Sequence, residues 1–170
     1  MPSPAWLTLS GEEEIAEDAS GEDSLGGMSK EAHEGEIMIL GVEQNIYQPT
    51  DPLTGQPTGA PISEGLTVLK YFDKTSPLLL ESMTKGEVFE TGTLSYYRTP
   101  IEGKEEHYFT QEIEDIVITD IVSYMPNCFD PANDNYTHME KVTLQYRKST
   151  WTHEVAGTEG GFEVGIFPGE

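Results

Sequence analysis

One segment carries a strong helix pattern in a chain whose other apolar segments follow the pattern of β-strands. Residues 73–87 read DKTSPLLLESMTKGE. Ser76 is a favourable N-cap because its hydroxyl can accept a hydrogen bond from a free backbone N–H of the first turn. Pro77 suits the first helical position, where no N–H is needed, and Gly86 suits the left-handed position that ends a helix. The sequence therefore predicts a short helix with marked ends.

The predicted helix has one apolar side, formed by Leu79, Leu80 and Met83 at helical spacing. A helix of about ten residues is not stable alone in water. We therefore expect it to pack against the β-structure that precedes and follows it.

Alternating and continuous apolar patterns predict about seven strands. They lie at residues 5–9, 37–47, 66–72, 88–98, 107–113, 116–125 and 142–146, the last of which can continue towards residue 151. Short connections favour antiparallel hairpins. The predicted fold class is mainly β: a two-sheet β-barrel or sandwich of antiparallel strands with one short α-helix.

Three segments are expected to lie outside the strands of a single domain over residues 1–170. An acidic loop covers about 11–36, and its part from 12 to 36 holds ten acids against Lys30 alone, which is typical of a solvated, mobile segment. A loop at 48–61 has four prolines and two glycines, and loops of that length are usually functional or disordered. A glycine-rich tail at 157–170 is expected to be loose at its end.

The charge of the chain excludes some partners. The 170 residues carry 31 acids against 9 lysines and arginines, for a net charge of −22. Such a surface repels nucleic acid and anionic membranes, so we expect neither as a partner. The first residues, MPSPAWLTLSGEEEI, lack a basic region and a long apolar run. We therefore expect no signal peptide and no membrane insertion.

Motifs for catalysis or metal binding are not found in the sequence. His33, His107, His138 and His153 do not follow a metal-binding spacing, and Cys128 is the single cysteine. The segment 130–140, DPANDNYTHME, lacks the ligands that a calcium loop needs at its third and twelfth positions, so Asx-turns account for it better. A divalent-cation site in the acidic segment stays an alternative. We expect no enzyme, no cofactor and no metal.

Several long motifs, in order along nearly the whole chain, resemble one family. They are MPSPAWLTLSG at 1–11, DPLTGQPTG at 51–59, FDKTSPLLL at 72–80, YRT at 97–99, EHYFT at 106–110, MPNCFDPAN at 125–133 and YRKSTWTHEVAGT at 146–158. The chain resembles Hcp, the hemolysin-coregulated protein family of bacterial type VI secretion systems. Residues 12–36 are more acidic than is typical of that family.

The resemblance implies a structural subunit without catalysis. Members form hexameric rings that stack into the inner tube of the secretion system, inside a contractile sheath and above a baseplate, with a spike protein at the tip. The ring lumen also carries small secreted effectors. The resemblance further implies that the protein is made in the bacterial cytoplasm and secreted without a signal peptide.

Two other functions compete with a stacked tube. One is an effector-binding ring, a receptor or chaperone that seldom stacks, and the other is a hydrolase whose Ser, His and Asp meet only in the fold. For assembly we expect contacts from the 48–61 loop, whose length without regular structure favours a functional role. The residues concerned are Pro49, Thr50, Asp51, Pro52, Leu53, Thr54, Gly55, Gln56, Pro57 and Thr58.

Overall fold

The computed structural model describes residues 3–12 and 14–164. The strands are β1 (Ala5–Ser10), β2 (Ile37–Ile39), β3 (Gly41–Tyr47), β4 (Ile62–Tyr71), β5 (Phe89–Arg98), β6 (Glu106–Tyr124), β7 (Met139–Gln145), β8 (Lys148–His153) and β9 (Thr158–Glu163). The α-helices are α1 (Glu22–Leu25) and α2 (Thr75–Lys85), and short 3-10 turns lie at Gly26–Met28, Glu31–His33 and Pro131–Asn133.

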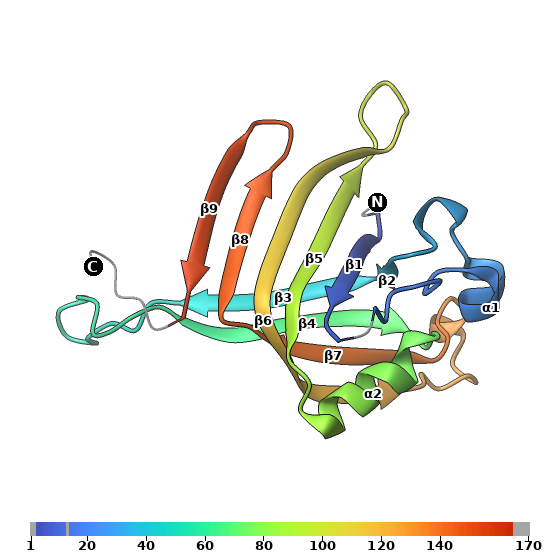
Figure 1. The fold of residues 1–170 in the computed structure, drawn as a ribbon, viewed down its shortest axis with the longest axis horizontal. Helices are drawn as coiled ribbons and strands as arrows, with labels where there is room; N and C mark the ends of the chain where they lie inside the picture. Colours follow the sequence, from blue (N-terminus) through green and yellow to red (C-terminus); the bar gives the residue numbers. More distant parts are fainter. Residues whose placement is uncertain (1–2, 13, 165–170) are drawn as a thin grey trace.

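The strands form two antiparallel layers that share β6 (Figure 1). The hydrogen-bonded order is β2-β1-β5-β6-β7-β4-β3, and β8 pairs with β6 on one side and with β9 on the other. One layer contains β1, β2, β5, β8, β9 and the first part of β6, while the other contains β3, β4, β7 and the last part of β6. The predicted fold class, mainly β with two antiparallel sheets, is confirmed.

Strand β6 runs through both layers. Its first part pairs with β5 as far as Ile116, and its last part pairs with β7 from Val117 onward. At the change Asp115 has a φ of 52°, and the β7 ladder shifts register between Ile118 and Asp120. The prediction of two separate strands at 107–113 and 116–125 is therefore wrong, because local distortion bends one strand without ending it.

The predicted strand at 37–47 is in fact two strands. Residue Leu40 separates β2, which pairs with β1, from β3, which pairs with β4. The backbone N–H of Leu40 donates to the carbonyl of Leu69 at 2.7 Å. Within the described residues, no hydrogen-bonded ladder joins β2 to β3, so the sheet is not closed. The backbone at Leu40 connects these two edge strands.

A second corner separates β7 from β8, where the sequence predicted one strand continuing towards Trp151. Arg147 occupies this corner, and its guanidinium binds the carboxylates of Asp115 and Glu163. The hydrogen bond to Asp115 is the main cause of a raised pKa for Arg147. The tail prediction also needs correction, because Thr158–Glu163 is strand β9, paired with β8; residues 165–170 lie outside the described part.

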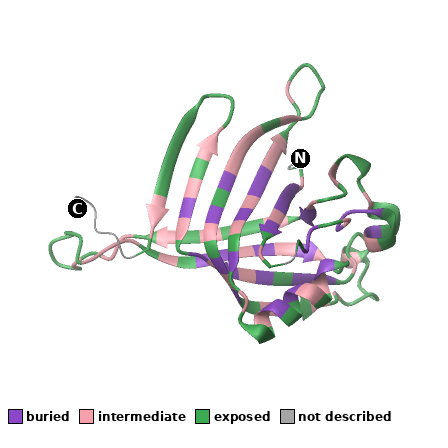
Figure 2. Cartoon of the chain, in the orientation of Figure 1, coloured by how far each residue is buried: buried purple, intermediate pink, exposed green. Residues whose placement is uncertain are grey.

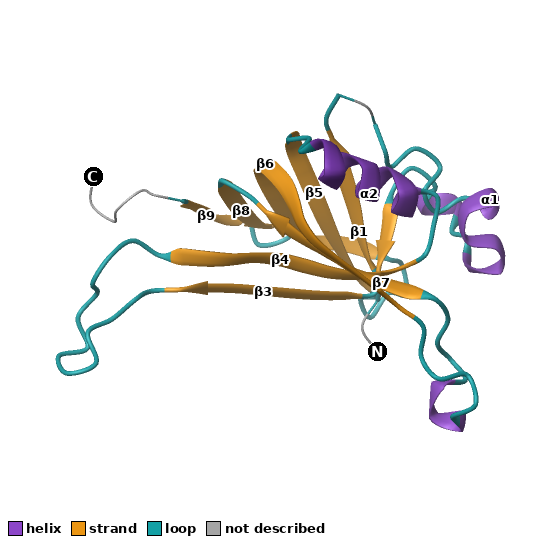
Figure 3. Cartoon of the chain, turned by 90° about the horizontal axis from the view of Figure 1, so that it is seen from below, coloured by secondary structure: helices purple, strands orange, loops and turns teal. Residues whose placement is uncertain are grey.

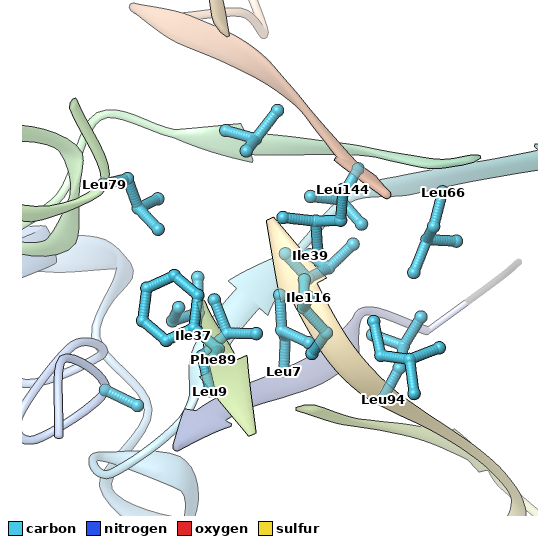
Figure 4. Close-up of a cluster of buried hydrophobic side chains, with 14 of the residues drawn as sticks. Leu7, Leu9, Ile37, Ile39, Leu66, Leu79, Phe89, Leu94, Ile116 and Leu144 are labelled. Carbon is cyan, nitrogen blue, oxygen red and sulfur yellow. The ribbon is translucent and has the colours of Figure 1, made fainter. Parts of the chain in front are cut away.

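The apolar core lies between the two layers and under α2 (Figure 4). Side chains from seven elements meet there, among them Leu9, Ile37, Leu66, Phe89, Leu94, Ile116 and Leu144, each at most 1% exposed. Figure 2 shows that buried residues concentrate where the layers cross, while the β8–β9 hairpin and the loop tips are largely exposed. The two layers thus pack against each other at one end and separate at the other.

Helix α2 begins earlier than predicted. It starts at Thr75, whose backbone N–H donates to Asp73 Oδ1 at 2.9 Å. Ser76 is therefore not the N-cap; its hydroxyl accepts from the Asp73 N–H and donates to Glu140 Oε1. Gly86 ends the helix in the left-handed conformation, with φ 68°, as predicted. Asp73, and not Ser76, thus accepts the hydrogen bond from the first turn of the helix.

The buried side of α2 differs from the predicted one by one residue. Leu79 is 2% exposed, whereas Leu80 is 51% exposed. Leu78 and Met83 pack on the core around Leu79. Figure 3 shows the helix lying across one end of the β5–β6 side of the sheet, where only one side of it meets strands.

The acidic segment is packed on one side, so the prediction of a wholly solvated loop is wrong. Ala16, Ala19 and Leu25 are buried, and the ring of His33 stacks on Trp6 with centroids 4.1 Å apart. Lys74 of the α2 start donates through its ammonium to the carbonyl of Glu17 at 2.9 Å. Most of the acids point outward from this packed backbone.

Changing Leu79 to Asp should lower the free energy of unfolding by about 3 kcal/mol or more, because the variant buries an unpaired charge. Leu80→Asp, one position along the same helix, should change it by only about 0.5 kcal/mol, as is usual for an exposed site. Chemical denaturation followed by circular dichroism measures both. Equal effects of the two variants would show that the observed helix orientation is wrong.

Candidate assembly surfaces

The loop for which the sequence predicted assembly contacts is an ordered extension of the β3–β4 hairpin. Thr50 and Pro57 form an isolated bridge across its base. Inside it, Asp51 Oδ1 accepts from the N–H of Leu53 at 2.7 Å, and the N–H of Gly55 donates to the Asp51 carbonyl at 2.8 Å. These bonds hold the loop in one shape, so binding through it loses little conformational entropy.

Leu53 stands at the tip of this loop with 95% of its surface exposed. Gly55 has a φ of 72°, which favours glycine. The loop projects well beyond the sheets at the far end of β3 and β4 (Figure 1). Residues 49–58 thus form one projecting loop. That they contact another subunit stays a prediction.

An open apolar groove lies where the two layers separate. Its volume is about 490 Å³, and its walls include Ile46 of β3, Phe109 of β6, Trp151 of β8 and Phe162 of β9. Phe109 meets Trp151 edge to face, with ring centroids 6.3 Å apart. The walls come from four strands, so no single segment of the sequence marks this groove, and the sequence analysis missed it.

A chain of side-chain hydrogen bonds joins the two layers. The hydroxyl of Tyr96 donates to Gln111 Oε1 at 3.4 Å, and the Gln111 amide donates to that of Gln44. The Gln44 amide donates to the Tyr146 hydroxyl, which also accepts from Ser63 at 2.8 Å. Burial, with a smaller contribution from Tyr108, raises the pKa of Tyr96 to about 12, so its hydroxyl stays neutral.

A buried ion network links the start of α2 to both central strands. The ammonium of Lys70 donates to Asp73 Oδ1 at 2.9 Å, to Glu140 Oε1 at 2.5 Å and to Ser76 Oγ at 3.1 Å. The side chains of Lys70, Asp73 and Glu140 are 1%, 1% and 4% exposed. The network fixes the beginning of α2 against β4 and β7, because a buried charge without its partner is costly.

The contacts of the histidines are structural. Two of them bond to polar side chains, His33 Nδ1 to Glu36 Oε2 at 2.5 Å and His107 Nε2 to Thr110 Oγ1 at 2.8 Å. His153 Nδ1 accepts from the backbone N–H of Ala156. Within residues 3–12 and 14–164, no group of three metal-ligating side chains is present, in the acidic segment or elsewhere.

The segment 130–140 forms the Asx-turn that its sequence favours, since Asp130 Oδ1 accepts from the N–H of Ala132 at 3.0 Å. Cys128, in the same connection between β6 and β7, is exposed and unpaired. Among the helices of the described residues, none has the length and apolar character needed to cross a bilayer.

Comparison with known proteins agrees with the arrangement of strands. The family model described as "Type VI secretion system effector, Hcp" matches residues 7–153. The chain belongs to the Hcp family. Its relatives include the "Major exported protein" of Pseudomonas aeruginosa, 44% identical over 162 residues that cover 94% of each chain.

Solved Hcp structures have the same fold. A crystal structure of an Hcp protein superposes with a TM-score of 0.89 at 36% identity, covering 95% of this chain and 99% of that one. The secreted protein Hcp3 from Pseudomonas aeruginosa gives a TM-score of 0.79 at 36% identity, with 94% and 97% covered. These matches confirm the family resemblance noted in the sequence, and with it a type VI secretion tube protein of the kind that forms ring oligomers.

Replacing Lys70 with Met should lower the free energy of unfolding by about 3–5 kcal/mol, because two buried carboxylates lose their common partner. Adding Glu140→Met should recover part of that loss by removing one of the unpaired charges. Lys30→Met, which removes an exposed lysine, is the control and should have little effect. Urea titration measures all three. A Lys70→Met protein as stable as the control would show that the network contributes nothing to stability.

Proposed function

We propose that six copies of this Hcp protein close into a ring, and that the rings stack into the inner tube of a type VI secretion system. The observation that carries this proposal is the family match over residues 7–153 together with a superposition that covers 95% of the chain. The role is structural, without catalysis. In this role the spike protein, the contractile sheath and the baseplate are its partners, and small effectors occupy the ring lumen.

The uncovered surfaces of the subunit support assembly on physical grounds. Among the described strands, β3 and β9 each pair on one side only, so their other edges offer backbone groups for pairing. The groove between the layers leaves Trp151 44% exposed, and apolar patches of this kind are typical of contact surfaces. When one face of a subunit binds a different face of the next, a ring of subunits leaves neither face uncovered.

Export is part of the proposal. The Pseudomonas aeruginosa relative is named a major exported protein, and we propose the same fate for this chain, from the bacterial cytoplasm and without removal of an N-terminal segment. An effector-binding ring that seldom stacks is the second candidate, supported by the apolar groove of about 490 Å³. The two candidates differ in whether rings associate end to end.

Light scattering should give a mass of six subunits at micromolar concentration, and electron micrographs of concentrated protein should show rings joined into tubes. A monomer mass at every concentration would contradict the ring. Rings that stay single at all protein and salt concentrations would favour the effector-binding candidate. Varying the salt is necessary, because exposed charges act over about 10 Å at 0.1 M ionic strength.

Deleting residues 52–58 should leave the fold intact and weaken assembly, because the deletion removes the projecting tip outside the β3–β4 ladder. Leu53→Asn tests the apolar tip alone and should weaken assembly in the same direction, by less. Circular dichroism checks the fold and sedimentation velocity measures the assembly state. If both variants assemble like the parent, residues 49–58 are a free surface loop.

A further inference from the structure

The imidazole of His33 lies next to two carboxylates from different parts of the chain. Its Nδ1 donates to Glu36 Oε2 at 2.5 Å, and its Nε2 lies 3.8 Å from Glu105 Oε2. Glu36 ends the acidic segment, directly before β2, whereas Glu105 belongs to the loop between β5 and β6. The His33 side chain is only 11% exposed, so water screens these charges only in part. One histidine thus links two segments that are distant in sequence.

The two carboxylates have no lysine or arginine as a partner. Among the described residues, Glu36 and Glu105 each form an ion pair with His33 alone. Burial, and then the charges of these two acids, raise the pKa of Tyr97, whose ring meets that of His33 edge to face with centroids 5.0 Å apart. His33 is therefore the side chain that can neutralise the negative charge gathered here.

The other neighbours of His33 are aromatic rings. Trp6 of β1 stacks on it with the ring planes 9° apart and the centroids at 4.1 Å, an arrangement that suits a cation. On the far side of Tyr97, His107 stacks on that ring at 5.1 Å and bonds through Nε2 to Thr110 Oγ1. His107 forms no ion pair within the described part of the chain. A change in the charge of His33 therefore acts mainly on its own two carboxylates.

The number of protons on the ring decides how many carboxylates it can attract. An imidazolium donates from both nitrogens and a neutral imidazole from one, and histidine changes between these forms in the range of about pH 5 to 8. The contact with Glu36 is the closer of the two, so the single proton of the neutral ring stays on Nδ1. Nε2 then presents a lone pair to the carboxylate of Glu105. The two groups repel each other, and the contact with Glu105 is lost.

The β5–β6 loop has no other polar contact with a distant segment. Within residues 3–12 and 14–164, the remaining hydrogen bond of residues 99–105 is internal, from the N–H of Gly103 to the Pro100 carbonyl at 3.0 Å. The loop projects beyond the sheet (Figure 1), and Ile101 at its tip is completely exposed. Few buried contacts are typical of a segment that opens locally. The ion pair between His33 and Glu105 is therefore what holds this loop to the rest of the molecule.

We propose that His33 is a pH-sensitive switch that controls the order of the β5–β6 loop. In its protonated form the ring attracts both Glu36 and Glu105, and the loop is held against the acidic segment. In its neutral form the ring keeps Glu36 and the stack on Trp6 but releases Glu105, and the loop becomes mobile. The protein thereby changes one projecting loop without changing its fold. The switch lies within one chain and does not depend on the proposed ring.

A nitroxide spin label at the loop tip tests the switch. Cys128 is the single cysteine of the chain, so Ile101→Cys in a Cys128→Ser background gives one labelling site. Electron paramagnetic resonance of the full-length protein measures the rotational correlation time of the label. That time should be about threefold shorter at pH 8 than at pH 5.5, with the change inside the range in which histidines titrate. Equal mobility at the two pH values overturns the proposal.

Three further substitutions in the labelled protein assign the change to its residues. Glu105→Gln should abolish it and leave the label as mobile at pH 5.5 as it is in the parent at pH 8. Glu102→Gln, which neutralises a neighbouring exposed acid of the same loop, is the matched control and should keep the change. His107→Gln should keep it as well, since His107 bonds to Thr110. A pH effect that survives Glu105→Gln, or that is lost in His107→Gln, contradicts the proposed switch.

Quenching of Trp6 fluorescence separates release of the loop from opening of the acidic segment. The chain has two tryptophans, so Trp151→Phe leaves Trp6 alone. Acrylamide should quench it weakly at both pH 5.5 and pH 8, because the neutral ring of His33 stays stacked on the indole. Strong quenching at pH 8 would show that the acidic segment itself lifts, which overturns the assignment to Glu105. Both measurements apply to a monomer and to a ring, so failure of the switch leaves the ring proposal standing.

Discussion

The fold depends on one strand that belongs to two layers. β6 pairs with β5 and β8 in its first part and with β7 in its last part, so the layers cannot slide apart without breaking ladders on both. The bend of β6 sets the angle between the two layers, and the core side chains fill the space between them. Asp115, in the left-handed conformation, and the clasp from Arg147 lie at the bend. The open groove on the other side follows from the same angle.

The local patterns of the sequence predicted most strands, the end of α2 at Gly86 and the family. They failed where a partner elsewhere in the chain decides the outcome. Apolar alternation continues through Leu40, yet its neighbours pair with different layers. Ser76 has the chemistry of an N-cap, but Glu140 from a distant strand engages it. The buried alanines of the acidic segment are too small to stand out among ten acids.

The same distinction applies to the candidate contact surfaces: a surface within one segment could be predicted, and one built from several elements could not. The loop at 49–58 was predictable because prolines and glycines mark it in one segment. The groove between the layers was not, because its walls come from four strands. The carboxylates below α2 show the same limit: Asp73 and Glu140 are 67 positions apart in sequence and share one ammonium. Such a site cannot be recognised from the sequence, because its residues are far apart along the chain and form no motif.

The packed acidic segment has a consequence for how copies meet. Its backbone is held by the Trp6–His33 stack and by Lys74, so exposed acids such as Glu14, Glu17 and Glu22 stand on an ordered backbone. A fixed layer of charge retains its own mobile cations. When two such layers approach, those ions are confined between them and their osmotic pressure separates the surfaces. The segment therefore opposes the close approach of another acidic surface on the side of the molecule that carries it.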